Sequence, residues 1–193
     1  IKRTETWAAF GSLSYSLSAT TVRAELRYTQ ESKALLAGTD TTDANYRKVG
    51  EKTFPMWTPR FTIDYRREDG PLLYGSIAKG AKAGGFNAAA PTPGELPFEP
   101  ETNWTYELGL KSQWPDRRLL LNLAIFDSEM EGIQITNQSP NGPAVFITRN
   151  GGSGRSRGFE LETAYRPTDH WACSFTYSLA DARFKQATDS SLR

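Results

Sequence analysis

Apolar and polar residues alternate with a period of two along much of this chain. In residues 159–166, Phe159, Leu161 and Tyr165 occupy odd positions, and the even positions include Glu160 and Glu162. Residues 171–180 repeat the pattern, with an apolar side chain at every odd position. Successive side chains of a β-strand point to opposite faces, whereas helical steps of about 100° would scatter these sets around an axis. The pattern therefore predicts strands that each have one apolar face.

Eight strands in four antiparallel hairpins are expected from the segments that alternate. They are residues 7–17, 22–35, 57–67, 72–82, 103–114, 119–136, 145–166 and 171–186. Short turns rich in Pro, Asp, Gly and Ser are expected at 18–21, 68–71, 115–118 and 167–170. Longer polar loops are expected at 37–56, 84–102 and 137–154. Short connections at one end and long ones at the other predict an all-β, antiparallel, up-and-down sheet.

Three features favour a transmembrane β-barrel wall over a soluble β-sandwich, which also alternates. The polar face is heavily charged, which suits a wide water-filled lumen. Residues 119–136 and 145–166 exceed the 5–6 residues of an ordinary soluble strand. Aromatic residues cluster near strand ends, where aromatic girdles lie at a membrane interface. These residues are Trp7, Trp57, Trp104, Trp114, Tyr165 and Trp171.

Composition narrows the possible functions. The 193 residues carry 23 Lys and Arg against 22 Asp and Glu, for a formal net charge of +1, so charge gives no argument for a nucleic-acid partner. No apolar run approaches the roughly 18–20 residues of a membrane-spanning helix. One cysteine, Cys173, and one histidine, His170, make an internal disulfide impossible and a zinc site or catalytic triad improbable. We therefore expect no enzyme activity, no cofactor and no resident metal.

Several segments, in order, resemble TonB-dependent outer-membrane receptors. Residues 57–66 (WTPRFTIDYR) and 72–87 (LLYGSIAKGAKAGGFN) are similar to a strand-turn-strand stretch of that family. Residues 100–111 (PETNWTYELGLK) resemble the next strand, residues 118–135 its partner, and residues 158–162 (GFELE) another recurrent segment. Residues 10–15 and 23–28 fit the hairpin that precedes them. Each piece is weak by itself, and the ordered set is specific.

The resemblance implies a 22-stranded barrel around an N-terminal plug, which takes up scarce ligands, usually ferric siderophores, with energy from a TonB complex. Residues 1–193 would form part of the β-barrel domain, about eight of its strands, without the plug, the TonB-contacting box or the C-terminal closing strand. The resemblance also places the chain in the bacterial outer membrane, among lipid and lipopolysaccharide. It makes the short turns periplasmic and the long loops extracellular.

Two groups of residues are candidate ligand contacts. Lys79, Lys82, Phe86 and Asn87 lie where a strand enters a long loop, so we expect them near the upper lumen. Arg155 and Arg157, in the Gly-rich segment 151–158, could meet an anionic ligand or a lipopolysaccharide phosphate. That segment lacks the Gly-Lys-Ser/Thr ending, the spacing and the following helix of a phosphate-binding loop. Glu160 and Glu162 lie about 7 Å apart on one strand face, where they more simply face water or arginines of a plug.

Two other functions stay open at this point. Eight strands could close a small barrel, so a passive porin or a small eight-stranded outer-membrane barrel is one alternative. The other is a soluble β-sandwich that acts as a binding module. An open sheet with two unpaired edges would favour a fragment of a larger barrel, and pairing of the first strand with the last would favour a small closed one.

Overall fold

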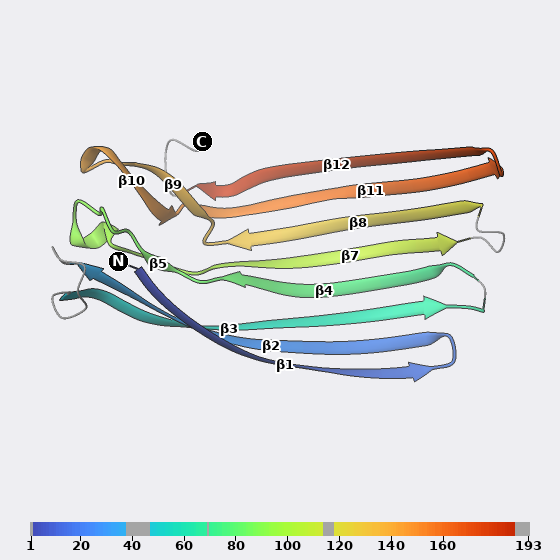
Figure 1. The fold of residues 1–193 in the computed structure, drawn as a ribbon, viewed down its shortest axis with the longest axis horizontal. Coiled ribbons are helices and arrows are strands. Elements are labelled where there is room, and N and C mark those ends of the chain that lie inside the picture. Colours follow the sequence, from blue (N-terminus) through green and yellow to red (C-terminus); the bar gives the residue numbers. More distant parts are fainter. Residues whose placement is uncertain (1, 38–46, 69, 114–117, 188–193) are drawn as a thin grey trace.

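A computed structural model describes residues 2–37, 47–68, 70–113 and 118–187, and these residues form one large antiparallel sheet (Figure 1). Its eight strands are neighbours in the order β1-β2-β3-β4-β7-β8-β11-β12. They are β1 (Lys2–Leu17), β2 (Thr20–Ala37), β3 (Arg47–Arg66), β4 (Leu72–Lys82), β7 (Glu101–Gln113), β8 (Leu119–Glu131), β11 (Gly152–Thr168) and β12 (Trp171–Ala187). The predicted all-β, up-and-down sheet of eight long strands is confirmed.

The large sheet is open. Its outermost strands are β1 and β12, and within the described ranges they do not pair with each other. The remaining strands form two small ladders, β9 (Gln134–Ser139) with β10 (Gly142–Asn150) and β5 (Gly85–Phe86) with β6 (Pro97–Phe98). Neither ladder is a second large sheet stacked on the first. The described part of the chain is therefore neither a closed eight-stranded barrel nor a sandwich.

The predicted strands 7–17 and 57–67 begin earlier than expected, at Lys2 and Arg47. Two other predicted strands are wrong because each is divided at a glycine. The expected strand 119–136 ends at Glu131, and a new strand begins at Gln134. Gly132 between them has φ +65°, and an added Cβ would lie 2.8 Å from the Pro100 carbonyl oxygen. The expected strand 145–166 divides around Gly151 into β10 and β11. The predicted loop 137–154 therefore contains most of the β9–β10 hairpin.

The other connections follow the prediction in part. Short turns join β1 to β2 at Ser18, which has φ +52°, and β11 to β12 at residues 169–170. Of the predicted loop 37–56, residues 47–56 belong to β3 and residues 38–46 lie outside the described residues. The predicted loop 84–102 holds β5, β6 and the short 3-10 helix η2 (Pro93–Glu95). Residues 114–117, which include Trp114 and most of the predicted turn 115–118, lie outside the described residues.

The strand register aligns the alternating residues of neighbouring strands, so one face of the sheet is apolar and the other is polar. Side chains of directly paired residues lie on the same face. One row on what we call the apolar face runs from β1 to β12. It contains Tyr15, Val22, Ile63, Gly75, Leu108, Ile125, Phe159 and Leu179. The opposite side, the polar face, holds charged residues such as Arg23, Asp64, Glu107 and Glu160.

The apolar residues form a belt bounded by aromatic and charged side chains at the long-loop margin. Aromatic rings border it on β1, β2, β3 and β7, and ring centroids along Trp7, Tyr28 and Trp57 are 5.1 and 4.5 Å apart. Charged residues border it on the remaining strands. The border residues are Trp7, Tyr28, Trp57 and Trp104, together with Lys79, Asp127, Arg157 and Asp181.

This belt slants across the strand register. On β1 the first charged residue beyond the belt is Glu5, opposite Ser32 of β2. On β12 it is Asp181, whose row crosses β2 at Ala24. The margin thus moves eight residues in seven strand steps. With about 3.3 Å per residue and about 4.8 Å between strands, the strands are tilted by about 40° relative to the normal of the belt.

Tight packing is concentrated at the long-loop end. Phe54, Met56 and Ala83 form a buried cluster, where the segment after β4 folds over the polar face of β3. Many large apolar side chains of the belt are about half exposed or more, for example Leu108 at 60%. The sheet face is therefore unpacked, and the loops at one end have a small core. Among the described residues, no helix has the length and apolar character needed to span a bilayer.

Candidate functional site

A pocket of about 490 Å³ lies at the long-loop end of the sheet. Its walls come from β2, β3, β4, the segment 83–100 that follows β4, and the β9–β10 hairpin. We call residues 83–100 the first loop. The lining residues are Glu31, Lys33, Met56, Ala81, Lys82, Ala83, Phe98, Gln134, Thr136 and Thr148. Glu31, Lys33, Met56 and Lys82 belong to the polar face by register, so the pocket opens on the lumen side expected from the sequence.

The cations of this pocket differ in their partners. Lys33 Nζ lies 2.8 Å from Glu31 Oε1 and donates a hydrogen bond to the Gly84 carbonyl oxygen. Lys82 is exposed and has no hydrogen bond or ion pair within the described part of the chain. Glu101, directly opposite Lys82 in register, accepts a hydrogen bond from the Gln134 backbone N–H. Lys82 is therefore the pocket cation that is available to an anionic oxygen.

The wall opposite the sheet offers neutral polar groups. Thr136 and Thr148 lie across from each other on β9 and β10, and their hydroxyl oxygens are 2.9 Å apart. Gln134 Nε2 donates to the carbonyl oxygens of Ala83 and Glu99. Phe98 adds an aromatic side chain. The pocket thus combines a free ammonium, two hydroxyls and apolar surface, which suits a polar, negatively charged organic ligand.

The structure separates the four residues that the sequence placed in one patch. Lys82 lines the pocket, whereas Lys79 has the opposite parity on β4 and lies on the apolar face, with Nζ 5.9 Å from the Trp104 ring centroid. Phe86 and Asn87 are buried in the first loop. Phe86 packs against Gly50 of β3, and the Asn87 side chain bonds to backbone groups. Of these four residues, Lys82 is the one that lines the pocket.

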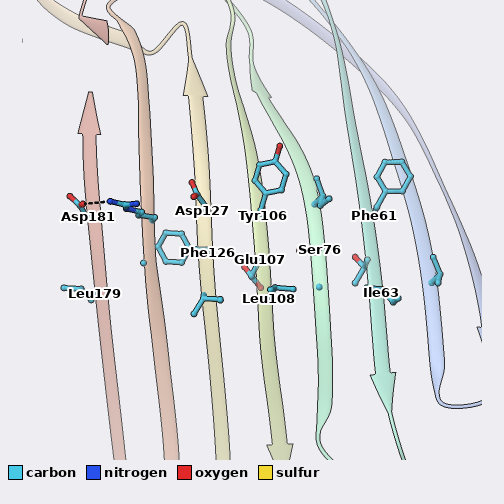
Figure 2. Close-up of a pocket in the computed structure, with 17 residues that line it drawn as sticks. Phe61, Ile63, Ser76, Tyr106, Glu107, Leu108, Phe126, Asp127, Leu179 and Asp181 are labelled. Carbon is cyan, nitrogen blue, oxygen red and sulfur yellow. Dashed lines mark ion pairs between the residues drawn. The ribbon is translucent and has the colours of Figure 1, made fainter. Parts of the chain in front are cut away.

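Arg155 and Arg157 also lie on the apolar face, at the charged margin of the belt. Arg155 forms a bidentate ion pair with Asp127. The Arg157 guanidinium lies 3.9 Å from Asp181, and a dashed line at Asp181 marks this ion pair in Figure 2. Arg157 is among the residues that line a broad open depression of about 910 Å³, and most of the others belong to the belt, such as Phe61, Ile63 and Leu108. These arginines therefore do not share the pocket of Lys82. Nor do Glu160 and Glu162, on the polar face of β11.

No group of three or more His, Cys, Asp and Glu side chains that could hold a metal ion is found in the described ranges. The pocket can therefore be assessed by its hydrogen-bonding and charged groups.

In the first loop, Glu95 accepts hydrogen bonds from Ser139 Oγ at 2.7 Å and from Thr92 Oγ1 at 2.9 Å. The bond from Ser139 is the main cause that holds the pKa of Glu95 below its ordinary value.

A depressed pKa makes the contact between Glu95 and the hairpin depend on pH. The contact contributes stability above the unfolded pKa of a glutamate, about 4.3, and loses it as the pH falls through the lower folded pKa. We expect hydrogen-exchange protection at residues 139–141, corrected for intrinsic rates, to fall in that acidic range. Glu95→Gln should remove this pH dependence, and an unchanged profile in that variant would contradict the assignment.

Comparison of the sequence with known families identifies the family of this chain. Residues 1–192 match the family described as TonB dependent receptor-like, beta-barrel. The chain belongs to the TonB-dependent receptor β-barrel family. Members of this family are transport receptors of the outer membrane in Gram-negative bacteria. The open sheet of the described residues is thus part of a TonB-dependent receptor barrel.

Solved receptors share the fold at low sequence identity. The ferric yersiniabactin uptake receptor FyuA from Yersinia pestis is 21% identical, with a TM-score of 0.73, and the match covers 95% of this chain and 27% of that one. For the ferric-catecholate import receptor Fiu from E. coli K12, the values are 18%, 0.70, 97% and 29%. For the Serratia marcescens hemophore receptor HasR, a double mutant, they are 18%, 0.70, 92% and 34%. The TonB-dependent receptor chain thus spans about a third or less of these structures.

Proposed function

We propose that this chain is the pocket-bearing part of a receptor for TonB-energised uptake of a scarce ligand, a ferric siderophore. Residues 1–193 supply about eight of 22 barrel strands, and the plug domain, the TonB-contacting segment and the closing strand belong to other parts of the receptor. The observation that carries the proposal is the position of the 490 Å³ pocket on the polar face, at the long-loop end. In a receptor barrel, that is the external mouth of the lumen.

The dimensions of the belt support its placement in a bilayer. On β1 it extends from Trp7 to Leu17, which is ten residue steps of about 3.3 Å. At a tilt of about 40°, this length corresponds to a belt about 25 Å tall, the height of the apolar band of outer-membrane barrels, whose strands tilt by about 35–45°. Aromatic residues at Trp7, Tyr28, Trp57 and Trp104 fit the interfacial girdle. These features support an outer-membrane location for the strands.

The charge of the pocket favours an anionic chelate as ligand. Lys82 offers an unpaired ammonium, while Thr136 and Thr148 offer hydroxyl groups within the same pocket. Iron bound by carboxylate or catecholate oxygens presents negative oxygens at its surface, and a charge-assisted hydrogen bond is stronger than a neutral one. FyuA and Fiu, which are similar in fold, import ferric chelates according to their descriptions. We therefore assign Lys82 as a ligand contact.

We further propose lipopolysaccharide as the partner of the charged belt margin. Arg157 and Arg183 are the most exposed basic side chains there, at 61% and 77%. Asp181 lies between them and accepts a hydrogen bond from Arg183 at 2.7 Å. An arginine near the bilayer interface is tolerated far better than one at the midplane, and its planar fork matches phosphate oxygens. Headgroup phosphates of the outer leaflet therefore suit this margin.

Uptake by the intact receptor tests the proposed function. Wild-type receptor should import a radiolabelled ferric tris-catecholate or ferric citrate chelate, and import should cease without TonB. Lys82→Gln should weaken binding of the accepted chelate by about tenfold, because a charged hydrogen bond contributes about 1.5 kcal/mol or more. Titration of purified receptor with the chelate measures this change.

Lys79→Gln is the matched control, because Lys79 lies on the same strand but on the apolar face. It should bind the chelate as wild type does. Equal losses in the two variants would argue against a pocket role for Lys82. Diffusive entry of ferric chelates that does not need TonB would instead indicate a passive channel.

A further inference from the structure

Two asparagines join the first loop to the β9–β10 hairpin through the same bonding pattern. Asn87 lies in the first loop, and Asn150 ends β10. Each side-chain amide pairs with both the N–H and the carbonyl of one residue in the other segment, as a neighbouring strand would. Neither asparagine lines the pocket itself.

The Asn87 side chain forms two hydrogen bonds with the backbone of Thr148 in the hairpin. Its Oδ1 accepts the Thr148 N–H at 2.9 Å, and its Nδ2 donates to the Thr148 carbonyl oxygen at 2.8 Å. The second Nδ2 hydrogen goes to the Glu95 carbonyl oxygen, also at 2.8 Å, which braces the first loop itself. Asn87 is 7% exposed, so loss of its amide would leave several polar backbone groups unpaired in a buried place.

Asn150 makes the corresponding pair of hydrogen bonds to the first loop, at the backbone of Glu99. Its Oδ1 accepts the Glu99 N–H at 2.7 Å, and its Nδ2 donates to the Glu99 carbonyl oxygen at 2.9 Å. The other Nδ2 hydrogen goes to the Gly132 carbonyl oxygen at 2.8 Å, which braces the entry to the hairpin. Each of the two segments therefore supplies one asparagine side chain, and each has one residue whose backbone bonds to the asparagine of the other segment.

These two sets of asparagine hydrogen bonds fix the position of the polar wall of the pocket. Thr148, the residue gripped by Asn87, lines the pocket and meets the hydroxyl of Thr136. Glu99, the residue gripped by Asn150, also places its side chain 2.6 Å from Lys52 Nζ on β3. Hence the hairpin is tied to the first loop, and the first loop is tied to the sheet. The distance between Lys82 and the threonine hydroxyls depends on these ties.

We propose that Asn87 and Asn150 are positioning residues that pre-assemble the ligand pocket by locking the β9–β10 hairpin to the first loop. The inference rests on the proposed function, since it takes the pocket to be the binding site. Binding to a preformed pocket avoids the conformational entropy of ordering two loops around the ligand. The role differs from the ligand contact expected for Asn87 from its sequence position, because its amide is already fully engaged.

The test uses the intact receptor and the ferric chelate that wild type imports. Asn87→Ala should weaken chelate binding by about tenfold, because the hairpin must then be ordered on binding. It should also deprotect the Thr148 amide in hydrogen exchange. Asn122→Ala is the matched control, because Asn122 donates one side-chain bond to Glu162 within the sheet and lies outside the pocket lining. That control should bind as wild type.

A covalent tie distinguishes positioning from general damage. A Cβ at Gly142 would lie 2.8 Å from Pro91 Cγ, so cysteines at these positions can join the hairpin tip to the first loop outside the pocket. In a Cys173→Ser background, Asn87→Ala combined with Pro91→Cys and Gly142→Cys should regain wild-type affinity when oxidised and lose it when reduced. Wild-type affinity in Asn87→Ala alone, or no rescue by the disulfide, overturns the positioning role. Failure of wild type to bind any ferric chelate overturns the proposed function instead.

Discussion

Phe61→Arg should destabilise the intact receptor in lipid vesicles by about 2–4 kcal/mol, the cost of an arginine near the midplane of a barrel's lipid face. Phe61 lies on the apolar face of β3, between the girdle residue Trp57 and Tyr65. Its side chain is 54% exposed in the described sheet, so packing within the protein would predict a much smaller loss. The effect therefore reports contact with hydrocarbon. Denaturant titration of the vesicle-embedded receptor measures it.

Thr62→Arg supplies the control at the adjacent position. Thr62 has the opposite parity and faces the polar side, where Arg23 is its register partner on β2. Its replacement should change the unfolding free energy by less than about 1 kcal/mol, the usual range of exposed charge interactions. Similar losses for both variants would mean that the faces are misassigned.

Gly158→Ala should cost the same receptor about 1–3 kcal/mol, the usual penalty of overpacking. A Cβ at Gly158 would lie only 2.0 Å from the Leu179 carbonyl oxygen of β12 and 3.0 Å from the Phe126 ring. The first obstacle is backbone, so relief requires β11 and β12 to move apart and weakens their ladder. Heat-modifiable migration of the folded barrel on a gel, followed by denaturant titration, measures the loss.

Gly94→Ala tests whether any loss comes from glycine replacement as such. Gly94 lies in η2, and a Cβ there would meet no atom within 4 Å. This variant should be neutral or slightly stabilising, because alanine restricts the unfolded chain more than glycine does. A neutral Gly158→Ala would show that β11 and β12 are less closely apposed than the structure has them.

The sheet could be predicted from the sequence because alternation is a local signal that tertiary structure preserves. Residues 159–166 and 171–180 keep their period of two in β11 and β12, and the register extends it to one apolar face. The strand breaks were harder to see. Ile133 and Ile135 have the same odd parity as Leu123 and Ile125 of β8, so strand parity does not reveal the break at Gly132, although Asp127, Glu129 and Glu131 occupy the odd positions between them. The break depends on a positive φ, which the pattern of side chains does not encode.

The site was predictable only where it followed from strand parity. Lys82 and Lys79 lie three residues apart, an odd number, so they must face opposite sides of β4, and parity alone could have separated them. The buried positions of Phe86 and Asn87 could not be inferred in this way. They depend on Gly50 and on the backbone of Thr148, which are distant in the sequence, and no local rule connects them.

The two edges of the sheet have a consequence for how receptors of this kind evolve. Along β1 and β12, backbone donors and acceptors point away from the described sheet, and in hydrocarbon each unpaired group costs several kcal/mol. Such a sheet can enter a membrane only when both edge strands pair with further strands in the correct register. A segment of this size therefore cannot be exchanged between receptors as an independent unit. Recombination succeeds only where the strand register at both edges preserves the shear of the whole barrel.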